Sequence, residues 1–316
     1  MKKNTFGSTG LEVSELCVGT LPMGPLQTNV PIDTGAEMLL KAMESGVNFF
    51  DTAQMYRSYP YLQKAEKQYG KNVIIASKST AADYKGMEDA ITEALKELGR
   101  DYVDIFHLHA ARVDESVFEQ RSGAVEAMLK AKEKGYIRFA GISTHNASVV
   151  AKAATVPEMD VIYPLINKAG MGILGGGLPE MLQSIEQVRK SGKGMYAMKA
   201  LAGGHLVGDM TDAIGYVRAI PGMQSVSIGV VTVEELSLQL RIFNDEKIDT
   251  ATLAKLKAYK QLKIMPFLCK SCGICVKSCP NGALSMEDKV PFPDPAKCVL
   301  CGYCTPICPE FAIRLK

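Results

Sequence analysis

Short apolar runs alternate with helix-like segments eight times along the chain, and this alternation limits the fold more than any other feature. The helix-like segments repeat their apolar residues at the 3.6-residue period of an amphipathic helix. Parallel strands need long crossover connections, usually helices, so alternating strands and helices predict a parallel sheet. The predicted strands lie near residues 17, 48, 74, 104, 139, 162, 196 and 227.

Eight such units within about 240 residues fit a (β/α)8 TIM barrel, which typically takes ~250 residues. A doubly wound open sheet is the alternative, and it normally carries a Gly-x-Gly-x-x-Gly turn after its first strand. Residues 19–24 read Gly-Thr-Leu-Pro-Met-Gly, which lacks that spacing. We therefore expect an α/β chain whose residues 1–245 form a TIM barrel domain. Within that domain, a hairpin in residues 4–16 should come before the first barrel strand.

Local sequence signals also place several helix boundaries. A helix over residues 33–45 is expected to be capped by Asp33 or Thr34. One continuous helix is expected over residues 117–134, and a linking helix within residues 246–265.

Eight of the nine cysteines lie between Cys269 and Cys308, at the spacing C-x2-C-x2-C-x3-C-P repeated twice. In bacterial ferredoxins this run holds [4Fe–4S] clusters, and the fourth cysteine of each run ligates the other cluster. Two zinc sites are the alternative, but these more often use separated C-x-x-C pairs, sometimes with histidine. The expected ligands are Cys269, Cys272, Cys275 and Cys308 for one cluster, and Cys279, Cys298, Cys301 and Cys304 for the other.

Residues 266–316 thus resemble a two-cluster ferredoxin domain of α+β type. The segment is short for a hydrophobic core, so the clusters should supply much of its folding energy. Clustered cysteines of this kind suit a reducing compartment better than a disulfide scaffold.

Composition narrows the possible partners. The net charge of +2 gives no reason to expect nucleic acid or an anionic membrane as a partner. The sequence has no apolar run behind its N-terminal lysines and no stretch of about 18 apolar residues. We expect a cytoplasmic protein that acts on a small molecule, with a redox protein as a further partner of the clusters.

Polar residues stand at the ends of three consecutive predicted strands: Asp51, Lys78 and His109. Tyr56 follows Asp51 by five residues. In a barrel, the C-terminal strand ends face one pocket, so these four side chains should meet there. His107 lies two residues before His109 and is expected to be a hydrogen-bonded core histidine.

These residue types suit proton transfer to a carbonyl group. Tyrosine has an unperturbed pKa of about 10, and we expect the Lys78 ammonium to lower the pKa of Tyr56. Asp51 would pair with Lys78 and fix its position. His109 could donate a hydrogen bond to the carbonyl oxygen. Hydride has to come from a cofactor, because no side chain supplies it.

The same residues resemble the aldo-keto reductase family across roughly residues 4–245. The motifs that carry the likeness are Gly19-Thr20, Asp51-Thr52-Ala53-x-x-Tyr56, Ala76-Ser77-Lys78, Tyr102-Val103-Asp104 running to His109, and Gly141-Ile142-Ser143. The resemblance implies a TIM barrel, a catalytic tetrad of Asp51, Tyr56, Lys78 and His109 with Tyr56 as the general acid, and NADP or NAD bound in extended form.

The resemblance also implies a set of cofactor-binding positions: Gly19, Thr20, Ser143, Thr144, Asn167, Met198, Lys199, Leu201, Gly229, Thr232 and Glu235. Several depart from the family pattern. Thr144 replaces an asparagine, Met198 replaces an aromatic residue, and residues 228–232 contain no base for a 2′-phosphate. Glu235 could bind adenosine hydroxyls, or it could complete a capping box with Thr232.

Three functions follow from these features. The first is NAD(P)H-dependent reduction of an aldehyde or ketone to an alcohol, with the two clusters relaying electrons. The second is a ferredoxin-linked reductase that does not use nicotinamide. The third is an electron carrier or redox sensor on a vestigial barrel, which the complete tetrad disfavours.

Overall fold

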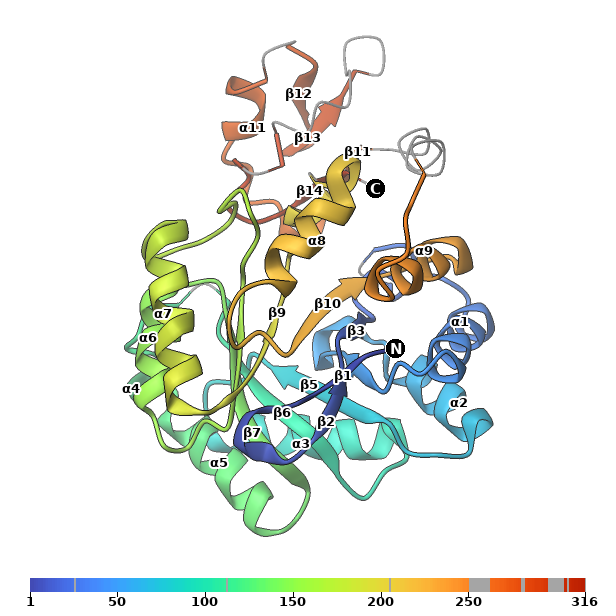
Figure 1. The fold of residues 1–316 in the computed structure, drawn as a ribbon. Helices are drawn as coiled ribbons and strands as arrows, with labels where there is room; N and C mark the ends of the chain where they lie inside the picture. The colour runs from blue at the N-terminus through green and yellow to red at the C-terminus, as the bar shows by residue number, and fades with distance from the viewer. Residues whose placement is uncertain are drawn as a thin grey trace.

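The fold is taken from a computed structural model, which describes residues 1–25, 27–111, 113–204, 206–249, 262–279, 282–294, 304–305 and 307–315. Its largest unit is a closed barrel of eight parallel strands, ordered β10-β3-β4-β5-β6-β7-β8-β9 (Figure 1). This confirms the predicted TIM barrel. The barrel strands are β3 (Leu16–Gly19), β4 (Phe49–Asp51), β5 (Ile74–Ser79), β6 (Val103–His109), β7 (Ile137–Thr144), β8 (Val161–Pro164), β9 (Gly194–Ala197) and β10 (Ser225–Gly229).

Amphipathic helices cover the outside of the barrel and bury their apolar faces against the strands. They are α1 (Ile32–Glu44), α2 (Tyr59–Tyr69), α3 (Tyr84–Leu98), α4 (Val117–Gln120), α5 (Ser122–Glu133), α6 (Ala147–Thr155), α7 (Leu178–Ser191), α8 (Met210–Arg218) and α9 (Val233–Phe243).

Two helix predictions were wrong in detail. Helix α1 begins one residue early, and its N-cap is Pro31 rather than Asp33 or Thr34. The predicted helix over residues 117–134 is broken at Arg121, whose φ of −117° and ψ of 30° leave the helical region. At this break the Arg121 guanidinium donates a hydrogen bond to the His109 carbonyl at 3.2 Å. A tertiary contact therefore outweighs local helix propensity here.

The N-terminal hairpin closes the lower end of the barrel. Strands β1 (Lys3–Thr5) and β2 (Glu12–Ser14) pair antiparallel, as predicted. Gly7 has a φ of +51°, and a Cβ there would lie 2.4 Å from the Gly194 backbone nitrogen, so only glycine fits. Phe6, the residue before Gly7, has a buried ring that packs edge-on against Phe49 inside the barrel.

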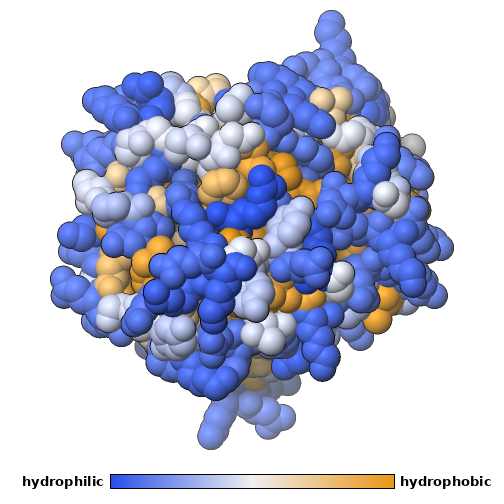
Figure 2. All heavy atoms as spheres, turned by 90° about the horizontal axis from the view of Figure 1, so that it is seen from below, coloured by the Kyte–Doolittle hydropathy of each residue, from blue (hydrophilic) through white to orange (hydrophobic). Residues whose placement is uncertain are grey.

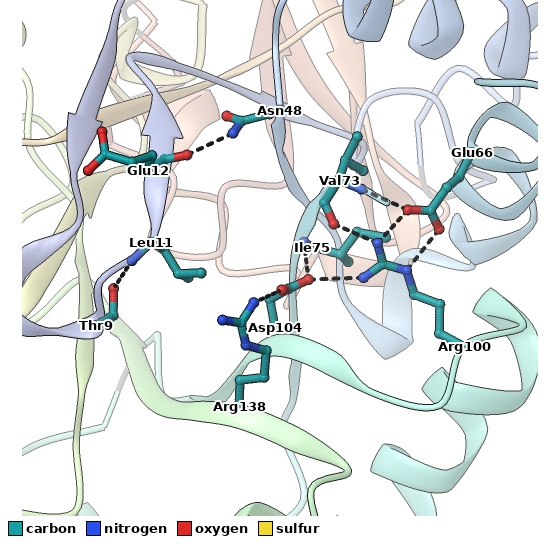
Figure 3. A network of polar contacts seen from close by, with 10 residues as sticks. All are labelled: Thr9, Leu11, Glu12, Asn48, Glu66, Val73, Ile75, Arg100, Asp104 and Arg138. Atoms are coloured by element: carbon teal, nitrogen blue, oxygen red, sulfur yellow. Dashed lines mark hydrogen bonds and ion pairs between the residues drawn. The ribbon is translucent and has the colours of Figure 1, made fainter. Parts of the chain in front are cut away.

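The same end of the barrel carries a buried charge network (Figure 3). Asp104, at the start of β6, accepts hydrogen bonds from the Ile75 backbone, from Arg100 and from Arg138. Arg100 also pairs with Glu66. The network is fully hydrogen-bonded and lies at the strand ends opposite the predicted site, so we assign it a structural role. Figure 2 views the molecule from below and shows a mostly hydrophilic surface with separate apolar patches.

The C-terminal part contains two small antiparallel sheets and a short helix, α11 (Ile274–Lys277). Strand β11 (Leu262–Ile264) pairs with β14 (Ile313–Leu315), and β12 (Leu284–Glu287) pairs with β13 (Val290–Pro293). The described ends of the predicted linking helix are not helical: residues 246–249 are irregular, and residues 262–264 form a strand. The rest of that predicted helix lies outside the described residues.

This C-terminal part meets the barrel at the upper end of its strands (Figure 1). Strand β14 contacts the turn η3 (Ala202–Gly204), which follows β9. Lys263 of β11 donates a hydrogen bond to the backbone oxygen of Gln27, in the loop after β3. Among the described residues, no helix combines the length and apolar character needed to cross a membrane.

Candidate active site

The structure brings together the four residues that the sequence predicted to meet. Asp51 ends β4, and Tyr56 ends the single turn η2 (Gln54–Tyr56) that follows it. Lys78 lies near the end of β5, and His109 ends β6. Because β4, β5 and β6 are neighbours in the barrel, their carboxyl ends place these side chains together at one end of the barrel.

Lys78 is held by three acceptors. Its Nζ lies 2.8 Å and 2.7 Å from the two carboxylate oxygens of Asp51, and 2.8 Å from the Thr52 carbonyl. An ammonium has three donors, so this arrangement satisfies all of them. Burial opposes the charged form of Lys78, but the Asp51 carboxylate outweighs it and the pKa of Lys78 is raised. Burial raises the pKa of Asp51, and Lys78 counteracts part of that rise.

Tyr56 lies above this ion pair. The Lys78 Nζ is 4.8 Å from the centroid of the Tyr56 ring, and the His109 ring stands edge-on to it at 6.5 Å. The expected fall in the pKa of Tyr56 was wrong in sign. Burial raises that pKa, and the opposing effect of Lys78 does not reverse it. Desolvation wins because the phenolate would have to form in a pocket closed to water.

His109 is a neutral imidazole at physiological pH. Burial, followed by the positive charges of Lys78, Arg121 and Lys199, lowers the pKa of His109 to about 3. Its Nδ1 is buried and has no hydrogen-bond partner in the part of the chain that the structure describes. A buried polar atom without a partner is costly, so this nitrogen suits a ligand at the site.

A second layer of polar residues lies beneath the ion pair. The Tyr196 hydroxyl of β9 donates to Asp51 Oδ1 at 3.1 Å, and His107 Nε2 lies 2.8 Å from the same hydroxyl. This confirms His107 as a hydrogen-bonded core histidine. Gly141 makes room for it, since a Cβ there would lie 2.4 Å from His107 Nδ1.

Tyr196 was not among the site residues predicted from the sequence. Tyr163 stacks on the Tyr196 ring at 3.8 Å, and both rings belong to the aromatic filling of the barrel that begins at Phe6 and Phe49. The alternation of side chains along a strand could have pointed to Tyr196. Tyr196 lies two residues before Met198, so both side chains lie on the same face of the strand, as those of Phe49 and Asp51 do.

The predicted nicotinamide-binding residues differ in whether their polar side-chain atoms already have hydrogen-bond partners. Ser143 is buried, and its hydroxyl has no partner among the described residues. Asn167 is already bound to the loop beyond it, because its Nδ2 donates to the Met171 carbonyl at 2.9 Å and its Oδ1 accepts from the Met171 backbone at 3.0 Å. Thr144 Oγ1 accepts from the Asn146 backbone at 3.1 Å. Of these three residues, Ser143 is the one whose buried polar atom has no hydrogen-bond partner among the described residues.

Met198, Lys199 and Leu201 lie in the loop after β9. Met198 packs against the residues that fill the barrel, and Leu201 is half-buried against the helix layer. Lys199 has a φ of 63°, a left-handed conformation that non-glycine residues rarely adopt. Its Nζ stands 5.5 Å from the ring centroid of Phe311, which belongs to the C-terminal part.

Gly19 and Thr20 pack against the strands and loops that hold Asp51, and do not line an open channel for a cofactor. The Thr20 backbone nitrogen donates to the Asp51 carbonyl at 2.9 Å. The hydroxyls of Thr20 and Thr52 both lie within hydrogen-bond distance of Ser58 Oγ, at 2.7 Å and 2.8 Å. A Cβ at Gly19 would lie 3.1 Å from Ser227 Oγ. These contacts fix the carbonyl end of β4, where Asp51 stands.

The residues after β10 form a helix cap. Thr232 Oγ1 accepts a hydrogen bond from the Glu235 backbone at 3.2 Å, and the Glu235 carboxylate accepts one from the Val231 backbone at 2.8 Å. Thr232 therefore caps the helix as predicted, whereas the Glu235 carboxylate binds the backbone of Val231 rather than that of Thr232, so the capping box is formed only in part. Gly229 lies against Pro22, where a Cβ would come within 2.4 Å.

Four cysteines surround one cavity in the C-terminal part. Cys269, Cys272, Cys275 and Cys308 line it together with apolar residues such as Pro291 and Ile313. Backbone N–H groups point at two of these sulfurs: Ser271 toward Cys269 at 3.4 Å, and Ala312 toward Cys308 at 3.3 Å. Cluster sulfurs take such hydrogen bonds, so these residues fit an iron–sulfur cube.

The second predicted cluster is described only in part. Cys304 is buried, and Cys279 Sγ accepts a hydrogen bond from the Ala283 backbone at 3.3 Å. Cys298 and Cys301 lie outside the described residues.

Comparison with known proteins identifies both parts of the chain. The model of the aldo/keto reductase family matches residues 15–260, and that of a 4Fe-4S dicluster domain matches residues 268–312. An uncharacterized oxidoreductase of Bacillus subtilis, YqkF, is 22% identical over 309 residues, covering 84% of this chain and 98% of that protein. The L-galactose dehydrogenase of Arabidopsis thaliana is 31% identical over 154 residues, covering 44% of this chain and 47% of that protein.

Solved structures show the same fold. A putative aldo-keto reductase from Pseudomonas aeruginosa matches with a TM-score of 0.65 at 22% identity, covering 77% of this chain and 94% of that one. The aldo-keto reductase AKR11C1 from Bacillus halodurans, in its holo form, matches with a TM-score of 0.65 at 18% identity, covering 81% of this chain and 96% of that one. The chain therefore belongs to the aldo/keto reductase family and carries a 4Fe-4S dicluster domain behind its barrel.

Proposed function

We propose that the protein reduces an aldehyde or ketone to an alcohol, with Tyr56 as the general acid. The observation that carries the proposal is the position of the Lys78 ammonium. It is fixed by Asp51 and the Thr52 carbonyl, and lies 4.8 Å from the Tyr56 ring centroid. A fixed positive charge beside a phenol stabilises the phenolate that remains once the proton has moved to the substrate oxygen.

The raised pKa of Tyr56 suits this role. A general acid has to hold its proton until the substrate is bound, and burial keeps Tyr56 in the neutral form. Lys78 then favours the product state of the transfer more than the resting state, which lowers the barrier selectively. Neutral His109 can orient the carbonyl oxygen through a ring nitrogen.

A nicotinamide fits one end of the site. NADPH or NADH, when bound, supplies the hydride that no side chain can provide. The Ser143 hydroxyl would hold the carboxamide, because it is buried and without a partner among the described residues. The capped acidic turn at Thr232 and Glu235 offers no positive charge to a 2′-phosphate, which favours NADH over NADPH.

The two [4Fe–4S] clusters are proposed to be held by the eight cysteines of the tail. Each cluster, when present, exchanges one electron at a time with a redox protein partner. The cavity lined by Cys269, Cys272, Cys275 and Cys308 supports the first ligand set. The second set, Cys279, Cys298, Cys301 and Cys304, rests on the spacing of the cysteines.

One observation favours a second candidate, a ferredoxin-linked reductase without nicotinamide. Phe311 of the cluster domain packs into the loops that the resemblance assigned to the cofactor. Its ring lies 5.4 Å from the His145 ring, and a Cβ at Gly172 would lie 2.6 Å from it. Asn167 is also already engaged with Met171. Both features reduce the room and the hydrogen-bonding groups for nicotinamide.

Substitution of Tyr56 by phenylalanine tests the proposal. Reduction of methyl 4-formylbenzoate by Tyr56→Phe, followed anaerobically with NADH, NADPH or reduced ferredoxin as the donor, should fall about 10²- to 10⁴-fold. Tyr136→Phe is the matched control, because that tyrosine is 46% exposed and remote from the site. Unchanged reduction by Tyr56→Phe would refute the acid role. Which donor supports turnover decides between the two candidates, and reduction by none would favour a redox carrier.

We further propose a division into a barrel over residues 1–245, a connection over residues 246–265 and a cluster domain over residues 266–316, in a cytoplasmic protein.

A further inference from the structure

The two-stranded sheet β11–β14 of the cluster domain presents different residues on its two faces. Ile313 is buried in the core of that domain, and Leu262 and Ile264 pack against the same core. Side chains alternate along a strand, so Lys263 and Arg314 project from the opposite face. That face meets the barrel, because Lys263 donates a hydrogen bond to the Gln27 carbonyl in the loop after β3.

Lys263 and Arg314 are direct partners in the β11–β14 ladder. Like charges placed opposite each other on one face of a sheet destabilise it. Neither side chain forms an ion pair with any residue that the structure describes, although Arg314 Nε donates to the Phe311 carbonyl at 3.4 Å. Two adjacent cations without a carboxylate are thus directed at the mouth of the barrel, where Lys78 is already neutralised by Asp51.

Arg314 lies on β14, which contacts the turn η3 at the barrel mouth, and its charge acts on Tyr56. Arg314 acts to lower the pKa of Tyr56, and burial lowers the pKa of Arg314 itself. Arg314 therefore combines partial burial, a positive charge and proximity to the proposed proton donor.

The segment before β14 holds this arginine at the site. Phe311 has a φ of 50°, a left-handed conformation that costs a non-glycine residue free energy and is found mostly where surrounding contacts enforce it. Its ring fits against Gly172, where a Cβ would lie 2.6 Å from the Phe311 ring and 3.3 Å from Leu165 Cδ1. Strand β14 also contacts η3 after β9. The segment is therefore held by the loops after β7, β8 and β9.

We propose that Arg314 of the cluster domain completes the substrate pocket of the barrel and binds an anionic group of the substrate, such as a carboxylate, beside the carbonyl that Tyr56 protonates. The inference rests on the proposed function of Tyr56, and it assigns the substrate class as carbonyl compounds that carry a negative charge. A planar guanidinium binds a carboxylate through two parallel hydrogen bonds, so the contact also orients the substrate.

Two aldehydes that differ in one charge provide the test: 4-carboxybenzaldehyde and its uncharged methyl ester, methyl 4-formylbenzoate. The holoprotein should reduce the acid with the lower KM. Arg314→Gln should raise the KM for the acid about 10- to 100-fold more than it raises the KM for the ester. Arg314→Lys, which keeps the charge, should recover part of the loss. Arg189→Gln is the matched control, because it removes an exposed arginine of α7 that pairs with Glu186.

Binding without turnover separates failure of this inference from failure of the proposed function. Benzoate should bind the wild-type holoprotein more tightly than benzamide by calorimetry, and Arg314→Gln should abolish that difference while iron content stays at about eight per chain. This result supports the assignment even if neither aldehyde is reduced. Equal effects of Arg314→Gln on acid and ester, or equal affinity of the wild type for benzoate and benzamide, would overturn it.

Discussion

The Tyr196 hydroxyl donates a hydrogen bond to Asp51 Oδ1 at 3.1 Å across the inside of the barrel. Asp51 belongs to β4 and Tyr196 to β9, which are not neighbours in the barrel. Asp51, which binds Lys78, is thus also held in place by the hydroxyl of Tyr196. Because Tyr196 donates to Asp51, its oxygen accepts from His107 Nε2, which fixes the Nε2–H tautomer of that histidine. His107 and Tyr196 are positioning residues for Asp51.

Tyr196→Phe should therefore lower kcat without abolishing turnover. The lost hydrogen bond to a charged acceptor is worth about 1.5–3 kcal/mol, so kcat should fall about 10- to 100-fold, with KM nearly unchanged. The measurement is steady-state kinetics with methyl 4-formylbenzoate, and Tyr136→Phe is again the control. A rise in KM at constant kcat would show instead that Tyr196 shapes the substrate pocket.

Breaking the buried ion pair should destabilise the barrel strongly. Lys78→Met leaves the Asp51 carboxylate buried without its cation, which typically costs about 3–5 kcal/mol in the free energy of unfolding. The double variant Asp51→Asn with Lys78→Met should recover much of that loss but none of the activity. Urea unfolding measures both. Lys85→Gln removes one member of the exposed Lys85–Asp89 pair and should leave stability essentially unchanged.

Protonation of His109 should couple stability to pH. Its folded-state pKa is lowered to about 3 by burial and by neighbouring positive charges, whereas the unfolded chain binds this proton below about 6.5. The unfolded state thus binds more protons between these values, so stability falls as the pH falls through that window. The slope is at most about 1.4 kcal/mol per pH unit.

His109→Gln removes this contribution. Its free energy of unfolding should vary less between pH 6.5 and pH 5 than that of the wild type, measured with denaturant under anaerobic conditions. Identical slopes in the two proteins would show that His109 titrates normally in the folded state.

Ser143→Ala tests the nicotinamide half of the site. Since the hydroxyl has no partner among the described residues, the substitution should leave the apoprotein as stable or slightly more so. It should weaken binding of NADH about 5- to 20-fold if the hydroxyl holds the carboxamide. Calorimetric titration measures the affinity, and Ser191→Ala on the end of α7 serves as control. Unaltered affinity would place the carboxamide elsewhere.

Cys308→Ala should remove one cluster and leave the other. Cys308 lines the same cavity as Cys269, Cys272 and Cys275, although it lies far from them in the sequence. Iron content after anaerobic purification should fall from about eight to about four per chain. Retention of about eight irons would contradict the assignment of Cys308 as a cluster ligand.

The sequence alone determined the barrel, the meeting of Asp51, Tyr56, Lys78 and His109, and the grouping of cysteines around a cavity. Each depends on a short-range pattern: strand and helix periods, polar residues at strand ends, or the spacing of ligands. A closed parallel barrel places all carboxyl strand ends on one face, so residues at those ends meet without further information.

The remaining features depend on the tertiary structure, in which parts of the chain that are distant in the sequence come into contact. The sign of the pKa shift at Tyr56 depends on how deeply the ring is buried, and the engagement of Asn167 depends on the path of the loop beyond it. The break at Arg121 coincides with a hydrogen bond from that residue to the His109 carbonyl, at the end of β6. The place of Arg314 beside Tyr56 joins residues more than 250 positions apart in the sequence. No local pattern encodes such a contact, because it results from docking one folded part of the chain onto another.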